Sequence, residues 1–120
     1  MAAQRRTSKG GATPRPGRPV RGSTSGRPIM ALLDLLGRRW ALRVLWELHE
    51  AGALGFAELQ ARSAGISPSV LSQRLKDLAD AGLVIAGDDG RYTPGRDAEQ
   101  LARILGDLDA WATRWGRRVS

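Results

Sequence analysis

The 120-residue chain contains no cysteine and only one histidine, His49. The absence of cysteine excludes disulfides, thiolate metal sites and thiol redox switches within this chain. A single histidine leaves little for metal binding or acid–base chemistry, and the sequence shows neither a phosphate-cradling Gly-rich loop nor a metal-ligand spacing. We therefore expect no catalytic residues, no metal and no cofactor, and an enzyme is the least favoured class.

Long hydrophobic runs are missing as well. Apolar residues make up 42% of the chain, which suits one small domain, but none of their runs approaches the roughly 20 residues that cross a bilayer. No apolar segment of the secretory type follows the basic N-terminus. We expect a cytoplasmic protein with no membrane partner, associated with the nucleoid if it binds DNA.

Acidic residues are absent from the first 28 positions, which hold seven of the 19 Lys and Arg residues. The other 12 basic residues balance the 12 acidic ones, so the net charge of +7 belongs to this tail. Residues 1–27 are rich in Gly, Pro, Ser, Thr and Arg and cannot bury enough apolar surface to become ordered. We predict a disordered basic arm, either a leader without a specific role or a DNA-contacting segment with the candidates Arg15, Arg18, Arg21 and Arg27.

Helical apolar spacing begins at Pro28 and predicts a domain over residues 28–118. A first helix ends at Gly37, a second runs from about Trp40 to Gly52, and a short third one over 57–62 buries Leu59. Residues 83–86 and 91–93 read as two strands joined by a GDDG turn. A long helix over about 97–117 carries a broad apolar face that includes Leu108, Trp111 and Trp115.

The stretch GISPSVLSQRLKDLADAGLV contains the most informative helix, predicted over residues 68–81. Ser67 is a favoured N-cap, and proline suits the first helical position. The buried stripe is Leu71, Leu75 and Leu78. A helix pair followed at once by a hairpin predicts a mostly α fold with a small β-hairpin, namely a winged helix-turn-helix with flanking dimerisation helices.

The opposite stripe of the 68–81 helix is polar and carries no acid at its centre: it consists of Ser69, Ser72, Gln73 and Lys76. Short hydroxyls permit close approach to DNA, Gln73 can bond an adenine edge with two hydrogen bonds, and Lys76 can reach guanine or phosphate. Arg74, to one side, is a candidate for the DNA backbone. The alternative is a merely solvated face, but serine is an indifferent helix former, so we favour base readout.

The stretches ALLDLLGRRWALRVLWEL, GFAEL and GISPSVLSQRLKDLADAGLV together resemble the HxlR-type winged-helix transcriptional regulators, over about residues 28–93. The resemblance implies a homodimer on an inverted-repeat operator, with recognition helices in adjacent major grooves and wings on the flanking backbone. By position it adds Ser67 to the DNA-contacting residues. It also implies dimerisation through the first and last helices, where Leu108, Trp111 and Trp115 could additionally form a pocket for a flat apolar effector.

The chain departs from the family pattern in three places. Arg27 stands before Pro28 where many members have a cysteine, so thiol sensing is excluded. The wing is reduced to GDDG, whose carboxylates repel phosphate, so only Arg91 could clamp the DNA backbone there. The join after the wing reads YTPGR in place of the usual pattern, and we expect it to be reshaped. The basic arm could replace the contacts that the short wing lacks.

Two rival functions predict different behaviour. A winged-helix protein-interaction module would dock a partner on Trp111 and Trp115 and show no salt-dependent DNA binding by the body alone. A non-specific nucleic-acid binder driven by the arm would lose binding with the arm and show no dependence on sequence.

Overall fold

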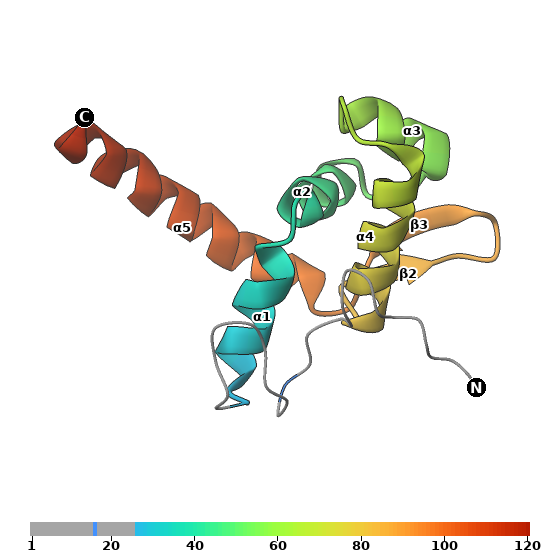
Figure 1. Ribbon diagram of the computed structural model, residues 1–120, viewed down its shortest axis with the longest axis horizontal. Coiled ribbons are helices and arrows are strands. Elements are labelled where there is room, and N and C mark those ends of the chain that lie inside the picture. The colour runs from blue at the N-terminus through green and yellow to red at the C-terminus, as the bar shows by residue number, and fades with distance from the viewer. Residues whose placement is uncertain (1–15, 17–25) are drawn as a thin grey trace.

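The computed structural model of the chain describes residue 16 and residues 26–120. Within them, the chain forms, in order, α1 (Pro28–Leu36), α2 (Ala41–Ala51), β1 (Leu54–Gly55), α3 (Phe56–Arg62), α4 (Pro68–Asp80), β2 (Val84–Ala86), β3 (Arg91–Pro94) and α5 (Ala98–Val119) (Figure 1). The predicted fold class is confirmed, with helix ends within one or two residues of those expected. Arg15, Arg18 and Arg21 of the predicted arm lie outside the described residues, whereas Arg27 is exposed at the start of α1.

The predicted hairpin is part of a three-stranded antiparallel sheet with the order β1-β3-β2. Ile85 pairs with Thr93 within the hairpin, and the two-residue strand β1 adds to its other edge through the pair Leu54 and Tyr92. A strand of two residues has no alternating pattern to read, so the sequence did not reveal it. Its effect is to fasten the start of α3 to the wing.

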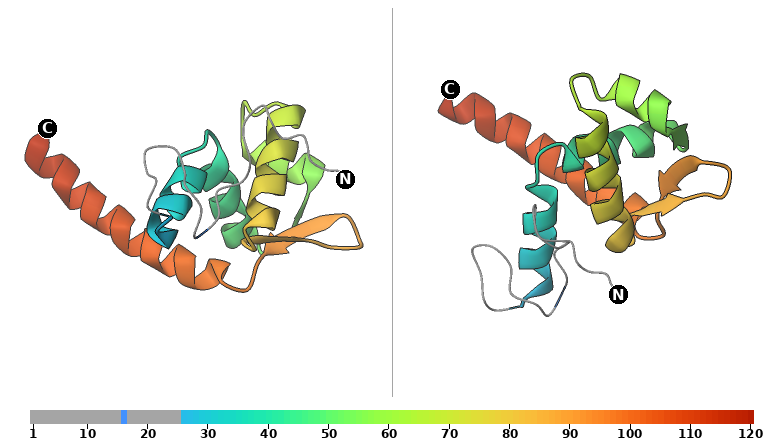
Figure 2. Two further views of the ribbon diagram at one scale, coloured as in Figure 1. Left: turned by 60° about the horizontal axis from the view of Figure 1, so that its bottom comes forward. Right: turned by 45° about the vertical axis from the view of Figure 1, so that its right-hand side comes forward.

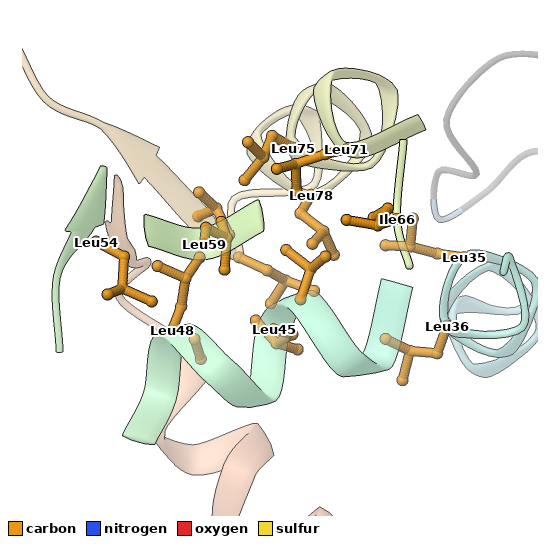
Figure 3. Packing of buried hydrophobic residues seen from close by; sticks show 14 residues of the cluster. Leu35, Leu36, Leu45, Leu48, Leu54, Leu59, Ile66, Leu71, Leu75 and Leu78 are labelled. Atoms are coloured by element: carbon orange, nitrogen blue, oxygen red, sulfur yellow. The ribbon is translucent and has the colours of Figure 1, made fainter. Parts of the chain in front are cut away.

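A single core joins the helix-turn-helix elements to the sheet. Leu48 of α2, Leu59 of α3, and Leu71 and Leu78 of α4 are completely buried. Figure 3 shows these side chains converging between α2 and α4, with Leu54 at the sheet end of the cluster. Because α4 contributes its whole apolar stripe to this core, its opposite face is left pointing away from the protein.

The α1–α2 turn ends in an unusual backbone conformation. Trp40, the residue before α2, has φ of 76°, a left-handed conformation that costs a non-glycine residue on the order of 1–2 kcal/mol. Its indole packs against the core and lies where a Cβ at Gly65 would be 3.7 Å from the ring. This packing offsets the backbone cost and fixes the turn beside the start of α4.

An ion-pair cluster ties α2 to α3. Arg43 Nε donates to Glu47 Oε2 at 2.9 Å, Arg62 Nε donates to Oε1 at 3.1 Å, and Arg43 Nη2 donates to the carbonyl of Arg62 at 2.6 Å. Partial burial by itself would raise the pKa of the Glu47 carboxyl, but the hydrogen bonds from Arg43 and Arg62 outweigh it and lower the pKa. Glu47 is therefore charged in the folded protein at neutral pH.

Replacing Glu47 with glutamine is expected to lower the free energy of unfolding at pH 7 by up to about 1 kcal/mol, because its two arginine partners are about half exposed and water screens the ion pairs. A lowered folded pKa contributes stability that is present above the ordinary value of 4.5 and is lost as the pH falls through the folded value. The stabilities measured by urea unfolding of the two proteins should therefore converge as the pH falls below 4.5 and through the folded pKa of Glu47. Glu50→Gln, an exposed change on the same helix, is the control, and a difference that is constant with pH would contradict the assignment.

The last helix leaves the body through a tight join at Gly95. The buried Gly95 donates its backbone N–H to the carbonyl of Leu83 at 2.8 Å, and a Cβ there would stand 2.1 Å from the carbonyl oxygen of Gly82. Only glycine fits this approach. From here α5 passes beneath α2 and projects well beyond the body, on the side opposite the wing (Figures 1 and 2). None of the helices between residues 26 and 120 has the length and apolar character needed to span a membrane.

Candidate nucleic-acid interface

Helix α4 begins as the sequence predicts. Ser67 has extended backbone angles, and its hydroxyl accepts a hydrogen bond from the backbone N–H of Val70 at 3.2 Å. Pro68 occupies the first helical position. The Ser69 hydroxyl lies 3.4 Å from that of Ser67, so two hydroxyls stand together at the amino end of the helix. This end carries the positive pole of the helix dipole, which favours a nearby phosphate.

The two faces of α4 separate as predicted. Leu71, Leu75 and Leu78 are buried in the core. The polar stripe is exposed on the opposite face and comprises Ser69, Ser72, Gln73 and Lys76. Within residues 26–120, α4 and the hairpin stand next to one another at one end of the molecule, with α5 projecting from the other (Figure 2). This stripe is thus a polar surface that is open to solvent.

A buried acid lies directly behind this stripe. Asp77 is 1% exposed, and its two oxygens have different partners. Oδ1 accepts a hydrogen bond from Gln73 Nε2 at 2.9 Å. Oδ2 accepts from Arg74 Nη1 and lies 3.1 Å from Arg38 Nη1, which comes from the α1–α2 turn. Asp77 therefore connects the exposed face of α4 to the body of the domain.

Sequence reasoning missed Asp77 because it lies off both stripes. The available signal is its opposite-charge spacing to Arg74, three residues earlier, together with its place beside Leu78 at the edge of the apolar stripe. Burial of an acid at such a position is favourable only with charged partners. The partner from the α1–α2 turn, Arg38, could not be identified without the tertiary structure.

Arg74 is placed differently from the rest of the predicted contacts. Its side chain is only 17% exposed and is directed at Asp77. The structure therefore does not bring its guanidinium to the exposed stripe, and its contribution to the fold of α4 is the ion pair. Lys76, in contrast, is 59% exposed and holds Asp80 at 3.0 Å. An exposed pair of this kind is worth about 0–1 kcal/mol, so Lys76 can exchange Asp80 for a phosphate or a guanine at little cost.

The wing is short and acidic at its tip. Gly87, Asp88, Asp89 and Gly90 form the turn, and Asp89 Oδ1 accepts a hydrogen bond from the backbone N–H of Arg91 at 3.0 Å. The Arg91 side chain is turned back toward the body. Its Nη2 donates to the carbonyl of Ala53 at 3.0 Å, and its Nη1 is 3.8 Å from Glu58 Oε1. To clamp a DNA backbone, Arg91 would have to leave the Ala53 carbonyl.

A second surface is apolar and extends along the outer part of α5. Ile104, Leu108, Trp111, Trp115 and Val119 are between 47% and 63% exposed. The Trp111 and Trp115 rings are stacked, with their centroids 5.9 Å apart and an interplanar angle of 10°. Ile29 and Leu33 of α1 are also about half exposed. So many large apolar side chains in contact with water mark an interaction surface.

A capped helix with one buried and one polar face, packed beside a three-stranded wing, defines a winged helix-turn-helix protein. The HxlR-like helix-turn-helix family matches residues 35–120. The chain belongs to this family, whose members are transcriptional regulators and not enzymes. The resemblance found in the sequence is thereby confirmed.

Individual relatives agree with this assignment. The HTH-type transcriptional regulator YvaP of Bacillus subtilis is 36% identical over 90 residues, which cover 69% of this chain and 82% of YvaP. The quinone-bound YodB of B. subtilis superimposes with a TM-score of 0.67 at 27% identity, over 72% of this chain and 94% of YodB. A transcriptional regulator of the MarR family from Enterococcus faecalis superimposes with a TM-score of 0.68 at 25% identity. The match covers 75% of this chain and 86% of that protein.

Proposed function

We propose that the protein regulates transcription as a homodimer that binds an inverted-repeat operator through α4. The observation that carries this proposal is the exposed polar stripe of Ser69, Ser72, Gln73 and Lys76, on a helix whose other face is packed in the core. A DNA-binding regulator must reach the chromosome, so its proposed location is the cytoplasm, at the nucleoid.

The stripe supplies both kinds of DNA contact. Gln73 and Lys76 have the donors and acceptors for base edges in a major groove, and Ser69 and Ser72 are short enough for the helix backbone to approach the bases. Ser67 supplies a backbone contact, because a hydroxyl whose oxygen accepts from Val70 still has a hydrogen that it can donate either to Ser69 or to a phosphate. Arg91 is the proposed clamp of the wing. For Arg74 we propose a backbone contact only in a complex that draws it away from Asp77.

Dimerisation is proposed to bury the apolar surface of α5 and α1. A twofold axis would place Leu108, Trp111 and Trp115 of one protomer against the same residues of the other, as a self-complementary interface requires. The projection of α5 beyond the body makes this face accessible to a partner (Figure 1). The two copies of α4 should then lie about 34 Å apart, one turn of DNA.

The stacked tryptophans also support a proposed effector site. YodB is known in a quinone-bound form, and a flat apolar molecule would fit against the Trp111 and Trp115 rings at a dimer interface. Covalent sensing through a thiol is excluded because the chain contains no cysteine.

Selection from a random DNA library at physiological salt tests the proposed function. The full-length protein should enrich an inverted repeat whose half-site centres lie about 10 base pairs apart. Retention of DNA without an enriched sequence would indicate the non-specific binder, and no retention would indicate the protein-interaction module. Either result contradicts operator reading.

Deleting residues 1–26 is expected to weaken operator binding and to flatten its dependence on salt, because the short acidic wing provides few contacts to the DNA backbone. Each phosphate that Arg15, Arg18 or Arg21 neutralises adds about 0.9 to the slope of log K against log[salt], and the deletion should remove that share. Fluorescence anisotropy from about 50 to 200 mM salt measures both quantities. An unchanged slope would show that the arm does not contact DNA.

A further inference from the structure

The side chain of Gln73 is held by a buried residue of the same helix, although Gln73 belongs to the exposed stripe. Its Nε2 donates to Asp77 Oδ1 at 2.9 Å, one helical turn further along α4. Lys76 has an exposed acid as its partner, but the acceptor for Gln73 is a carboxylate that is 1% exposed. A buried, charged acceptor is stronger and less mobile than an exposed one.

We propose that Asp77 is a positioning residue that fixes the amide of Gln73 so that α4 reads an adenine. This inference rests on the proposed function and names the base recognised at one position of each half-site. A carboxylate accepts hydrogen bonds only, so it holds the nitrogen end of the amide and repels the oxygen end. The two ends of Gln73 are therefore assigned before any DNA is bound.

The fixed amide still has one complete hydrogen-bonding edge. An amide nitrogen carries two hydrogens, and Asp77 uses one of them. The arrangement that reads adenine is the one in which Asp77 takes the hydrogen that points away from Oε1, because the other hydrogen and Oε1 then lie side by side as one donor and one acceptor. Adenine offers the complementary pair in the major groove, an N7 acceptor beside an N6 donor. Guanine presents two acceptors, and cytosine or thymine allows only one of the two bonds, so adenine is preferred.

Asp77 is suited to this task because it is itself fixed. Its second oxygen, Oδ2, is held by Arg74 from the preceding turn of α4 and by Arg38 from the α1–α2 turn. The side chain of Arg38 is 12% exposed and that of Arg74 is 17% exposed, so water competes little for the carboxylate. Through Asp77 and Arg38, the position of the Gln73 amide is fixed relative to the body of the domain. A free glutamine would instead have to be ordered on binding, at a cost in conformational entropy.

Library selection with four full-length proteins tests the inference: the wild type, Gln73→Ala, Asp77→Asn and the control Asp80→Asn, which removes the same charge one turn away. The operator position read by Gln73 is the one whose preference disappears in Gln73→Ala. Wild type and Asp80→Asn should prefer adenine there by about 5- to 100-fold. In Asp77→Asn the arginines compete for the single amide oxygen, so the preference should fall to less than about 3-fold while other positions keep theirs.

A second variant covers the loss of folding that removal of a buried charge can cause. Arg38→Met, Arg74→Met and Asp77→Leu together replace the whole cluster by apolar side chains, a change that is often neutral or stabilising. This triple variant also releases Gln73, and its adenine preference should be lost at the same single position.

The outcomes distinguish this inference from the proposed function. If the wild type enriches no sequence, operator reading fails and the inference falls with it. If the wild type enriches an inverted repeat but the Gln73 position prefers another base, only the inference is overturned. The inference alone is also overturned if Asp77→Asn and the triple variant both keep the full adenine preference. Loss of preference at every position would show that Asp77 merely supports the fold of α4.

Discussion

Replacing Gln73 and Lys76 together with alanine is expected to weaken binding to the selected operator by about 100-fold or more, while lowering the free energy of unfolding by only about 1–2 kcal/mol. Both side chains are exposed, so their removal leaves no cavity. The buried Asp77 loses its hydrogen bond from Gln73 but keeps its ion pairs with Arg38 and Arg74, so the domain should stay folded. A two-bond contact to a base is worth about 1–3 kcal/mol, and a dimer makes each contact twice. The loss of affinity should be large for the operator and much smaller for unrelated DNA.

The control for this pair lies on α5. Gln100→Ala with Arg103→Ala removes an exposed amide and an exposed positive charge of similar kind from a helix that lies away from the proposed DNA surface. Anisotropy titrations on the operator and on a scrambled duplex should show nearly wild-type affinity for the control. Equal losses in the two pairs would mean that binding follows charge and not the α4 stripe.

Replacing Trp111 and Trp115 with alanine is expected to dissociate the proposed dimer, raising its dissociation constant by about 1000-fold or more, because the double change removes four tryptophans from a symmetric pair. The two stacked rings are the largest apolar groups on the exposed face of α5. Tryptophans at the centre of an interface each contribute about 2 kcal/mol or more. Sedimentation equilibrium measures the change, and operator affinity should fall with it because one half-site alone supplies only half of the contacts.

Ile85→Ala is the matched control, because Ile85 is also about half exposed but lies on the wing. It should leave the dissociation constant of the dimer unchanged. A wild-type protein that sediments as a monomer at micromolar concentration would contradict the proposed assembly. A double tryptophan variant that remains dimeric would move the interface to another surface.

Most of the fold follows from local patterns in the sequence. The pair Ser67-Pro68 sets the start of α4, and the spacing of Leu71, Leu75 and Leu78 determines which face is buried. The polar stripe is then fixed by the geometry of the helix alone. The hairpin could also be located from a local pattern, the pair Asp89-Gly90, because Gly90 has the positive φ that such turns require.

The features that escaped prediction depend on contacts between distant residues. Strand β1 exists because Leu54 meets Tyr92, and Asp77 is buried because Arg38 reaches it from the α1–α2 turn. Arg74 turns inward toward Asp77, three residues further along α4, and so follows the burial of that acid. Periodicity places residues on a face, but it does not say which polar side chains at the edge of that face turn inward.

The central claim is that the exposed face of α4 lies in the major groove, and cysteine-directed DNA cleavage tests it most directly. Because the chain contains no cysteine, Ser69→Cys can carry a DNA-cleaving iron chelate at one defined position, with Glu50→Cys on α2 as the control. We predict cleavage by the Ser69→Cys protein at two places about 10 base pairs apart, symmetric about the operator centre. A Ser69→Cys protein that binds the operator without cutting it, or a Glu50→Cys control that cuts the same places, would contradict the claim.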